Sequence, residues 1–574
     1  MSLRSGTWQR KGAAAMVAGA VCAGLMLLAG VPAGATGSGT GLPPDDAAQV
    51  APSAGALAAL AQPNIVVVML DDMRSDELRF APNALRYVRD RGLDFRNSFS
   101  PYPLCCPARA SFLLGKYAHN HGVVHHEAPY GFGSLDDRTT IAGRLREAGY
   151  STALVGKYLN GYGEMKSRVT GGSSLRYVPR GWTDWYVGLE HTWPAGSPFG
   201  GGTYNYFHFT QNQNGRVVAN NGAYSSDVIG AQTRGLIEKY HRAERPFFLW
   251  VTPVAPHHGA PVEPDDPGKV TMSNGRQYDY VTPARPSWVK GRFDASITHG
   301  FGQPVDHAAE ADIADKPRFF RRVPEATRAE RRALTETERQ RAESIYAWDV
   351  QFGKIVQTLK KTGEYDNTVL VFTSDNGYYL GEHRQRLGKI LAHEPVIHVP
   401  LLVAGPAVRH GARYTPITTM DLTATVLDLA GARPLPAMDG ASKLPSMRGP
   451  DRAWTTAVVT EGLTKVLRPN ASSGVPRRLT TSGIRTGRYK LIRYSTGEGE
   501  LYDLVADPNE LRSRFRDPAY AGIRAELERL WRQYRSCARS ACRVPLPASL
   551  RTTPSALAAQ YRHARAQQDA YYNR

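Results

Sequence analysis

Cysteine is scarce in this chain, with 5 residues among 574, and the spacing of these residues matches no zinc-finger pattern. The sequence also lacks a Walker-type phosphate loop and a dense Lys/Arg tract, so it does not predict a nucleic-acid partner. Charged residues make up 21% of the chain and hydrophobic residues 42%, which excludes a disordered or fibrous protein. The 55 glycines and 39 prolines follow no period, which favours a loop-rich globular enzyme or binding protein.

The charge that is present is unbalanced, because 71 Lys and Arg residues face 52 Asp and Glu residues and leave a formal net charge of +19. A sequence pI near 9.7 favours an acidic membrane surface or an anionic polysaccharide as a partner. An Arg-rich composition without any partner explains the same charge, so this property alone leaves the question open.

Long apolar runs are absent except at the N-terminus, where basic residues precede an apolar stretch over about 13–31. Small residues follow this stretch, so it predicts a signal peptide over 1–35 and a secreted or otherwise extracytoplasmic protein with no stable membrane span after cleavage. A retained membrane anchor is the alternative, because the stretch approaches spanning length. Residues 36–62 are rich in Gly, Ala, Pro and Ser and predict a flexible linker.

Four cysteines follow that N-terminal segment, as two pairs far apart in the chain. Cys537 and Cys542 predict a small disulfide in an exported protein. Cys105 and Cys106 are adjacent, and adjacent cysteines rarely bridge each other, so this pair has no evident partner. An unpaired cysteine in an oxidising compartment is a candidate for chemistry, and a buried free thiol is the alternative.

Strand-like and helix-like segments alternate along the chain. Continuous β-branched and apolar runs predict strands that are buried on both faces of a parallel sheet. These runs span residues 64–70, 151–155, 246–251, 368–373 and 399–403. Helical patterns over 140–148 and 342–360 lie between them. This alternation predicts the α/β class, with a central, mostly parallel sheet flanked by helices.

Acidic and amide side chains follow two of these strands. Asp71 and Asp72 end the first strand, and Asp375 and Asn376 end the strand that begins near residue 368. Ligands bind α/β sheets at the carboxyl ends of the strands, where these four side chains would supply hard oxygen ligands for Ca²⁺ or Mg²⁺. Either pair alone is equally a helix cap or a turn former, whereas both pairs together favour a metal site.

The segment 103–117 is the most informative in the chain. Pro107 suits the first turn of a helix, which would place Cys105 just before a helix N-terminus. Free N–H groups at that end can hold a tetrahedral oxyanion, and Arg109 adds a planar cation for the same purpose. A nucleophile at Cys105 would therefore face an anionic substrate.

The pattern C-x-P-x-R from Cys105 to Arg109 resembles the signature of the formylglycine-dependent sulfatases. The resemblance implies that a formylglycine-generating enzyme oxidises Cys105 to Cα-formylglycine (3-oxoalanine). The hydrated gem-diol of that residue would attack the sulfur of a sulfate ester, with Arg109 steadying the nucleophile. Family-like segments run in order from Asn64 to about Glu510, so the resemblance covers most of the chain.

Further residues match the family by position. The resemblance implies a Ca²⁺ site, with Mg²⁺ as an alternative, formed by Asp71, Asp72, Asp375, Asn376 and the modified Cys105. It implies sulfate-binding roles for Lys157 and Lys389. It also implies a proton-donor role for His257, which its Ala-Pro-His context favours over the adjacent His258. These roles agree with the fixed cations, metal and acid that sulfate ester hydrolysis needs.

The chain departs from many arylsulfatases two positions after Lys157, where Leu159 replaces their histidine and Asn160 follows. The Gly-Lys-Tyr-Leu-Asn form instead resembles the N-acetylglucosamine-6-sulfatases and the extracellular 6-O-endosulfatases. The segment 259–341 mixes bases with acids and predicts a substrate-rim insertion or a solvated loop rather than a polybasic tail. We therefore expect a sulfatase that removes 6-O-sulfate from amino sugars of sulfated glycans.

The resemblance also divides the chain and gives its architecture. It implies an alkaline-phosphatase-like catalytic domain over 63–440, a smaller C-terminal α+β subdomain over 441–545 and a polar tail over 546–574. Within the subdomain, alternation over 484–494 predicts one antiparallel strand. A helix is expected from about Tyr520.

Two other functions fit the same residues. Related folds use this pocket for phosphoryl groups, so a phosphonate or phosphate ester hydrolase is the alternative enzyme. A non-catalytic protein that binds sulfated glycans is the alternative class, although the intact set of ligands and cations favours catalysis. The sequence leaves open whether Tyr158, Asn160 or His383 lines the substrate side of the pocket.

Overall fold

The computed structural model describes residues 62–573, except 195–196, 308 and 466–477. The predicted signal peptide and all of the predicted linker except Gln62 lie outside the described residues. Within the described part of the chain, no helix has both the length and the apolar character needed to cross a bilayer.

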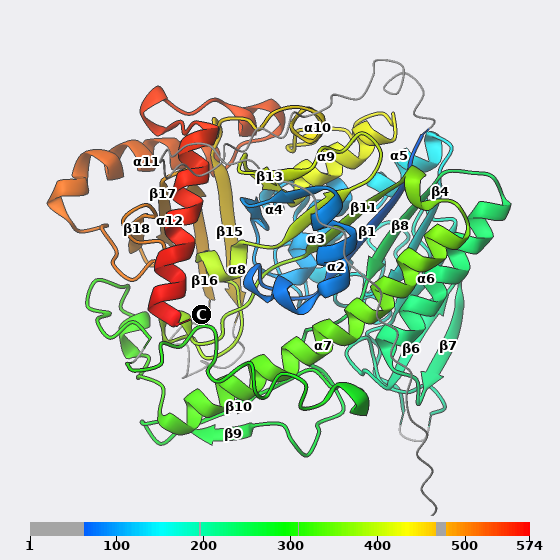
Figure 1. The fold of residues 1–574 in the computed structure, drawn as a ribbon, viewed down its shortest axis with the longest axis horizontal. Helices are drawn as coiled ribbons and strands as arrows, with labels where there is room; N and C mark the ends of the chain where they lie inside the picture. Colours follow the sequence, from blue (N-terminus) through cyan, green and yellow to red (C-terminus); the bar gives the residue numbers. More distant parts are fainter. Residues whose placement is uncertain (1–61, 195–196, 308, 466–477, 574) are drawn as a thin grey trace, which may run out of the picture. The chain divides into compact units, whose positions relative to one another are not determined.

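A sheet of 10 strands forms the centre of the fold (Figure 1). Its strands lie in the order β13 (Gly411–Arg413), β2 (Leu93–Phe95), β12 (Leu401–Ala404), β11 (Thr368–Ser374), β1 (Asn64–Leu70), β8 (Phe247–Thr252), β4 (Ser151–Gly156), β5 (Asp184–Gly188), β6 (His208–Gln213) and β7 (Arg216–Asn221). The five strands from β11 to β5 are mutually parallel. Antiparallel pairs flank them on both sides, so the predicted mostly parallel sheet is confirmed.

Helices cover both faces of this sheet (Figure 1). Side chains of β1 point alternately to the two faces, so Ile65 and Val67 enter one core and Val66 and Val68 the other. The first core includes residues of α3 (Cys105–Leu114), α5 (Ile141–Glu147) and α9 (Thr419–Leu429). The second includes residues of α2 (Pro82–Tyr87), α6 (Ser225–Arg242) and α7 (Arg328–Lys361). Burial on both faces explains the continuous apolar run of β1.

The five strands predicted for the large sheet and the two helices predicted between them are present, and the strand ends differ from prediction by at most two residues. The helix expected over 342–360 is longer, because α7 begins at Arg328. Thr327 and Glu330 form a capping box there, in which the Thr327 side chain accepts from Glu330 N and the Glu330 side chain accepts from Thr327 N. The capping box lies in a polar part of the sequence, before the apolar residues that predicted the helix over 342–360, so the predicted helix begins too late.

A second, antiparallel sheet lies in the C-terminal part of the chain. Its strands follow the order β15 (Val458–Lys465), β16 (Arg478–Arg485), β17 (Tyr489–Tyr494) and β18 (Gly499–Asp503). The single strand predicted over 484–494 is wrong, because a tight turn separates β16 from β17. Thr486 N donates to Tyr489 O at 2.8 Å, and Tyr489 N donates to Thr486 Oγ1 at 3.0 Å. Residues 485–488 are Arg-Thr-Gly-Arg, so the apolar pattern is interrupted here and Gly487 is a turn signal that the prediction did not use.

Two helices complete the C-terminal part. The helix expected near Tyr520 is α11 (Ala521–Tyr534), and the predicted disulfide between Cys537 and Cys542 follows it. The segment 546–574, expected as a polar tail, contains α12 (Pro554–Tyr572). Leu557 in the first turns of α12 is buried in the same core as the second sheet, so this helix is packed rather than a free tail.

The segment 259–341 is folded. It carries a short hairpin, β9 (Gly268–Thr271) and β10 (Gln277–Tyr280), and its acids pair with its bases. Arg285 is 1% exposed and contacts Glu263 at 2.8 Å and Asp265 at 2.9 Å. The mixture of charges seen in the sequence therefore builds internal ion pairs, which a solvated loop would not need.

Candidate active site

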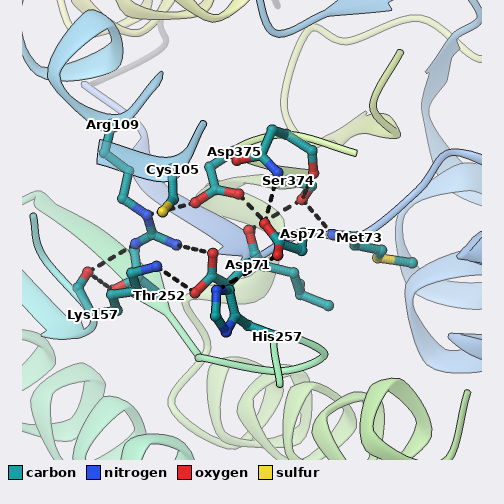
Figure 2. Close-up of polar contacts among 12 residues, drawn as sticks. Asp71, Asp72, Met73, Cys105, Arg109, Lys157, Thr252, His257, Ser374 and Asp375 are labelled. Carbon is teal, nitrogen blue, oxygen red and sulfur yellow. Dashed lines mark hydrogen bonds and ion pairs between the residues drawn. The ribbon is translucent and has the colours of Figure 1, made fainter. Parts of the chain in front are cut away.

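The carboxyl ends of β1 and β11 lie side by side (Figure 2). Asp375 N donates to Leu70 O at 3.1 Å, which continues the pairing of the two strands beyond their ends. Asp72 N donates to Asp375 Oδ1 at 3.1 Å, and Asn376 Nδ2 donates to Asp72 Oδ1 at 2.7 Å. These three side chains and Asp71 are fully buried. Strand register alone thus brings the four predicted oxygen ligands together.

Helix α3 carries the predicted nucleophile at its first residue. The helix begins at Cys105 and not after it, because the preceding Leu104 is extended, with φ at −156°. Cys105 is 3% exposed, and its thiol donates to Asn160 Oδ1 at 3.3 Å. Burial raises the pKa of the Cys105 thiol, although Lys157 and Lys389 oppose this change. The unmodified side chain is therefore a neutral thiol at physiological pH.

Arg109 lies one helical turn after Cys105 and is fully buried. Its Nε donates to Asp375 Oδ2 at 2.7 Å, and its Nη1 donates to Lys157 O at 2.9 Å. Burial alone would lower the pKa of the guanidinium, but Asp375 and Asp71 raise it above its ordinary value. Arg109 is thus a fixed cation that ties α3 to both β11 and the residue after β4.

The two predicted sulfate-binding lysines approach the same carboxylates. Lys157 Nζ lies 2.5 Å from Asp71 Oδ2, and Lys389 Nζ contacts Asp72 Oδ1. Burial would lower the pKa of each ammonium group, but Asp71 for Lys157 and Asp72 for Lys389 raise it above the ordinary value. Both side chains are therefore cations that an incoming anion can recruit away from the carboxylates.

The residue before Lys157 must be glycine. Gly156 has φ at +118°, and a Cβ atom on it would come within 2.1 Å of Thr252 O. The close approach lets Lys157 N donate to Thr252 O at 2.8 Å, while Thr252 Oγ1 donates to Lys157 O at 2.7 Å. These contacts fix the start of the Lys157 side chain at the carboxyl edge of the sheet (Figure 2).

His257 reaches the same carboxylates from the segment after β8. Its Nε2 lies 3.7 Å from Asp72 Oδ2, and its Nδ1 donates to His258 O at 2.7 Å. The rings of Tyr204 and His258 lie 4.6 and 4.2 Å from the His257 ring. Burial, followed by repulsion from His258 and the two lysines, lowers the pKa of His257 well below its ordinary value. The neutral ring therefore carries its proton on Nδ1.

The donor set fits a hard divalent cation. Asp71 Oδ1, Asp72 Oδ2 and Asn376 Oδ1 are buried oxygen atoms that lack a hydrogen-bond partner within the described ranges. Asp71, Asp72 and His257 also offer ligand atoms within 4.8 Å of one another. Oxygen-rich sites of this kind suit Ca²⁺ or Mg²⁺, because soft or imidazole-rich donor sets are the ones that favour zinc and copper.

Two further residues at the site, Glu190 and Tyr204, were not singled out in the sequence. Asn160 joins them, since its Nδ2 donates to Glu190 Oε1 at 3.0 Å and to Tyr204 Oη at 2.6 Å. Burial raises the pKa of Glu190. Glu190 follows β5 by two residues, a position at the carboxyl edge that could have drawn attention to it, whereas Tyr204 lies in a loop with no such signal.

The remaining sequence-derived candidates are separated by the fold. Asn160 contacts Cys105, as described, but Tyr158 is buried with its ring 4.9 Å from Trp185 in the core. His383 contacts Glu310 at 2.9 Å instead of Cys105. Cys106 is a fully buried free thiol, which matches the alternative considered for the vicinal pair.

Comparisons with known proteins agree with this geometry. A family profile described as Sulfatase matches residues 63–432, and one described as N-sulphoglucosamine sulphohydrolase, C-terminal, matches residues 381–536. An arylsulfatase of Chlamydomonas reinhardtii is 30% identical over 519 residues, which cover 84% of this chain and 76% of the relative. An N-acetylglucosamine-6-sulfatase of Capra hircus is 27% identical over 536 residues, which cover 86% of each chain.

A solved structure has the same fold. It is described as BT4656 in complex with its substrate D-Glucosamine-2-N, 6-O-disulfate, and it matches with a TM-score of 0.59 at 22% identity. The match covers 82% of this chain and 97% of the other. Together with the family profile, it confirms the expected alkaline-phosphatase-like architecture with a smaller C-terminal sheet.

Proposed function

Because the chain belongs to the sulfatase family, we propose that it hydrolyses sulfate monoesters at the 6-position of amino sugars in glycans. Membership makes it a sulfuric ester hydrolase. The substrate, the metal ion and the role of each residue are our proposals.

The proposal depends on how charges are arranged around the Cys105 thiol. Arg109 and Lys157 contact the buried carboxylates of Asp375 and Asp71, and Lys389 contacts Asp72 from another segment of the chain. An anionic sulfate group entering this site replaces carboxylate contacts of the lysines with contacts to its own oxygens. Preorganised cations of this kind stabilise charge that develops during transfer, which is commonly the largest contribution to catalysis.

The nucleophile and the metal supply the rest of the chemistry. Formylglycine at Cys105 would supply a hydrated aldehyde whose hydroxyl group attacks the sulfur atom. A divalent cation held by the free oxygens of Asp71, Asp72 and Asn376, together with Asp375, would polarise the sulfate oxygens. These side chains are buried, so water is largely excluded from the reacting group.

His257 is the proton donor that we assign to the leaving alcohol. Its Nδ1 is engaged with His258 O, so Nε2 is the atom available to the substrate. Burial lowers the pKa of this ring, but a bound anionic ester acts in the opposite direction by favouring the imidazolium. Substrate binding would thus favour the protonated form of His257 beside the leaving alcohol.

The 6-O specificity on amino sugars is supported by the segment after β4. Leu159 replaces the histidine that many arylsulfatases carry, and Asn160 contacts Cys105 from the next position. The N-acetylglucosamine-6-sulfatase of Capra hircus and the structure bound to D-Glucosamine-2-N, 6-O-disulfate are named for amino-sugar substrates. We further propose that the chain is exported and that a formylglycine-generating enzyme converts Cys105.

Substrate choice is tested by comparing N-acetylglucosamine 6-sulfate, 4-nitrophenyl sulfate and phenyl methylphosphonate as substrates of the purified enzyme. We expect the highest kcat/KM for the sugar sulfate. The Cys105→Ala variant should lose turnover by roughly 10⁴-fold or more. Cys106→Ala is the matched control, because Cys106 is a buried free thiol beside the site, and this variant should retain turnover.

Two outcomes would contradict the proposal. Preference for the phosphonate would support the alternative esterase of the same fold. Binding of sulfated glycan by a wild-type protein that releases no sulfate would support the non-catalytic alternative.

A further inference from the structure

The segment that carries Lys389, residues 381–393, has a strained backbone. His383, Arg384 and Ile390 have φ values of 53°, 56° and 95°. Such values are uncommon for residues other than glycine, and for a β-branched residue such as isoleucine they are a clear outlier. Each is an unfavourable conformation that persists only where the surrounding residues hold it. We refer to residues 381–393 as the Lys389 segment.

Three strands of the C-terminal sheet hold the last residues of the Lys389 segment. From β18, Glu500 Oε2 contacts His393 Nε2 at 3.0 Å. From β17, Lys490 Nζ donates to Ala392 O at 3.0 Å. On β15, Gly462 packs so closely that a Cβ atom on it would lie 2.5 Å from Ile390 O.

The two ends of the Lys389 segment are clamped together. The rings of His383 and His393 stack with their centroids 4.1 Å apart. Glu310, from the segment before α7, contacts His383 Nδ1 at 2.9 Å. These two histidines, Glu310 and Glu500 are each 3% exposed or less, and we call the four residues the histidine clamp.

The charges of the histidine clamp favour this stacked arrangement. Burial lowers the pKa of both rings, but Glu310 outweighs it at His383 and raises the pKa there. At His393, burial and the neighbouring His383 leave the pKa lowered. The opposite directions of these two shifts favour a proton on His383 over one on His393, which disfavours two like charges across the stack. Tyr379 Oη, 2.6 Å from His393 Nδ1, and Glu500 occupy both nitrogen atoms of His393.

We propose that the C-terminal sheet positions Lys389. The sheet holds the strained Lys389 segment through the histidine clamp, to which it contributes Glu500. In this arrangement the Lys389 ammonium reaches the sulfate site. The proposal rests on the sulfate-binding role proposed for Lys389. It gives the second sheet a part in substrate affinity, although its strands contribute none of the residues at the carboxyl edge of the large sheet.

A double-mutant cycle between the sheet and the lysine tests this proposal. The variants are Glu500→Gln, which keeps the shape of the side chain but removes its charge, Lys389→Ala, and the combination of the two. We measure kcat/KM on N-acetylglucosamine 6-sulfate and the inhibition constant of free sulfate, well below the Tm of each variant. Glu500→Gln should lower kcat/KM by about 10-fold and weaken sulfate inhibition, because the lysine is displaced. In the Lys389→Ala background the same change should have no further effect on either quantity, since interacting residues are not additive.

A control separates positioning from general stability. Asp184, at the start of β5, is 2% exposed, contacts Lys239 at 2.7 Å and accepts from Tyr240 Oη at 2.6 Å. Asp184→Asn removes a comparable buried charge away from the Lys389 segment, so it should lower the Tm without changing sulfate inhibition. If Glu500→Gln does not fold, Gly462→Ala replaces it in the cycle, because its new methyl group displaces Ile390 without altering any charge.

The possible failures are distinguishable. Additive losses in the cycle, or unchanged sulfate inhibition in Glu500→Gln, would overturn the positioning role. Full activity in Lys389→Ala would instead overturn the proposed role of the lysine itself.

Discussion

Three oxygen atoms at the carboxyl edge of the large sheet determine what the site can bind. Asp71 Oδ1, Asp72 Oδ2 and Asn376 Oδ1 are buried, and no donor reaches them within the described parts of the chain. A buried acceptor without a partner costs about 1–3 kcal/mol. Lys157 and Lys389 engage the other oxygens of the two aspartates, so they do not remove this cost. A hard divalent cation would satisfy all three atoms, and the stability of the protein should therefore depend on metal.

Calcium added to chelator-treated protein should raise its Tm. Binding to the folded state alone stabilises by about 2.7 kcal/mol when the free ion is at 100 times its Kd. Asp72→Asn should remove most of this rise, because it removes a charge and one of the free oxygens. Differential scanning calorimetry with and without calcium measures the effect. An equal rise in Asp72→Asn and wild type, or no rise in wild type, would contradict the metal site.

Helix α7 contacts both the end of β1 and the start of α2. Arg341 on this helix contacts Glu77 at 2.7 Å, and its Nη2 donates to Asp72 O at 2.7 Å. Two turns later, Asp349 accepts from Asn83 N at 2.7 Å and from Ala84 N at 2.9 Å, which satisfies donors at the start of α2. One helix thus supports both the end of β1 and the helix that follows it.

The Asp349 carboxyl makes stability depend on pH. Burial raises the pKa of Asp349 to about 6, although the N–H groups of Asn83 and Ala84 oppose this change. In the unfolded chain an aspartate titrates near 3.9. Between roughly pH 4 and 6 the folded state therefore binds more protons, so this residue stabilises the fold below that range and loses its contribution as the pH rises through it.

Asp349→Asn should remove that pH dependence, because the amide oxygen still accepts a hydrogen bond but cannot ionise. We expect wild type to lose up to roughly 3 kcal/mol between about pH 4 and 7 relative to the variant. Urea unfolding of both proteins at several pH values in this range measures the difference. Parallel stability profiles would show that Asp349 does not titrate in this way. The variant should keep its calcium-dependent rise in Tm, since Asp349 is not part of the metal site.

For the whole molecule, sequence reasoning succeeds where position along the chain fixes position in space. Parallel strands place their carboxyl ends at one edge, so Asp71 and Asp375 could be paired from the strands that precede them. Helical spacing likewise relates Cys105 to Arg109. These rules predict five strands of the large sheet and the placement of the acidic pairs and Cys105, whereas the roles of Lys157, His257 and Lys389 are expected from the family resemblance alone.

The rest depends on contacts between distant segments. Glu190 and Tyr204 meet Asn160 through loops whose course no local pattern sets. The histidine clamp forms only when the C-terminal sheet packs against the Lys389 segment, and residues of the second sheet carry no motif for that contact. The turn between Arg485 and Tyr489 is different, because Gly487 and the absence of apolar residues over 485–488 are local signals that the single-strand prediction did not use.

Peptide mass spectrometry across Cys105, on protein that releases sulfate from N-acetylglucosamine 6-sulfate, shows whether the proposed nucleophile is present. Conversion of the Cys105 CH2–SH group to an aldehyde replaces SH and H by one oxygen and lowers the peptide mass by about 18 mass units. We predict this loss, in a fraction of molecules that rises in proportion to specific activity. An active preparation in which the Cys105 peptide keeps the mass of the unmodified cysteine would rule out formylglycine as the nucleophile.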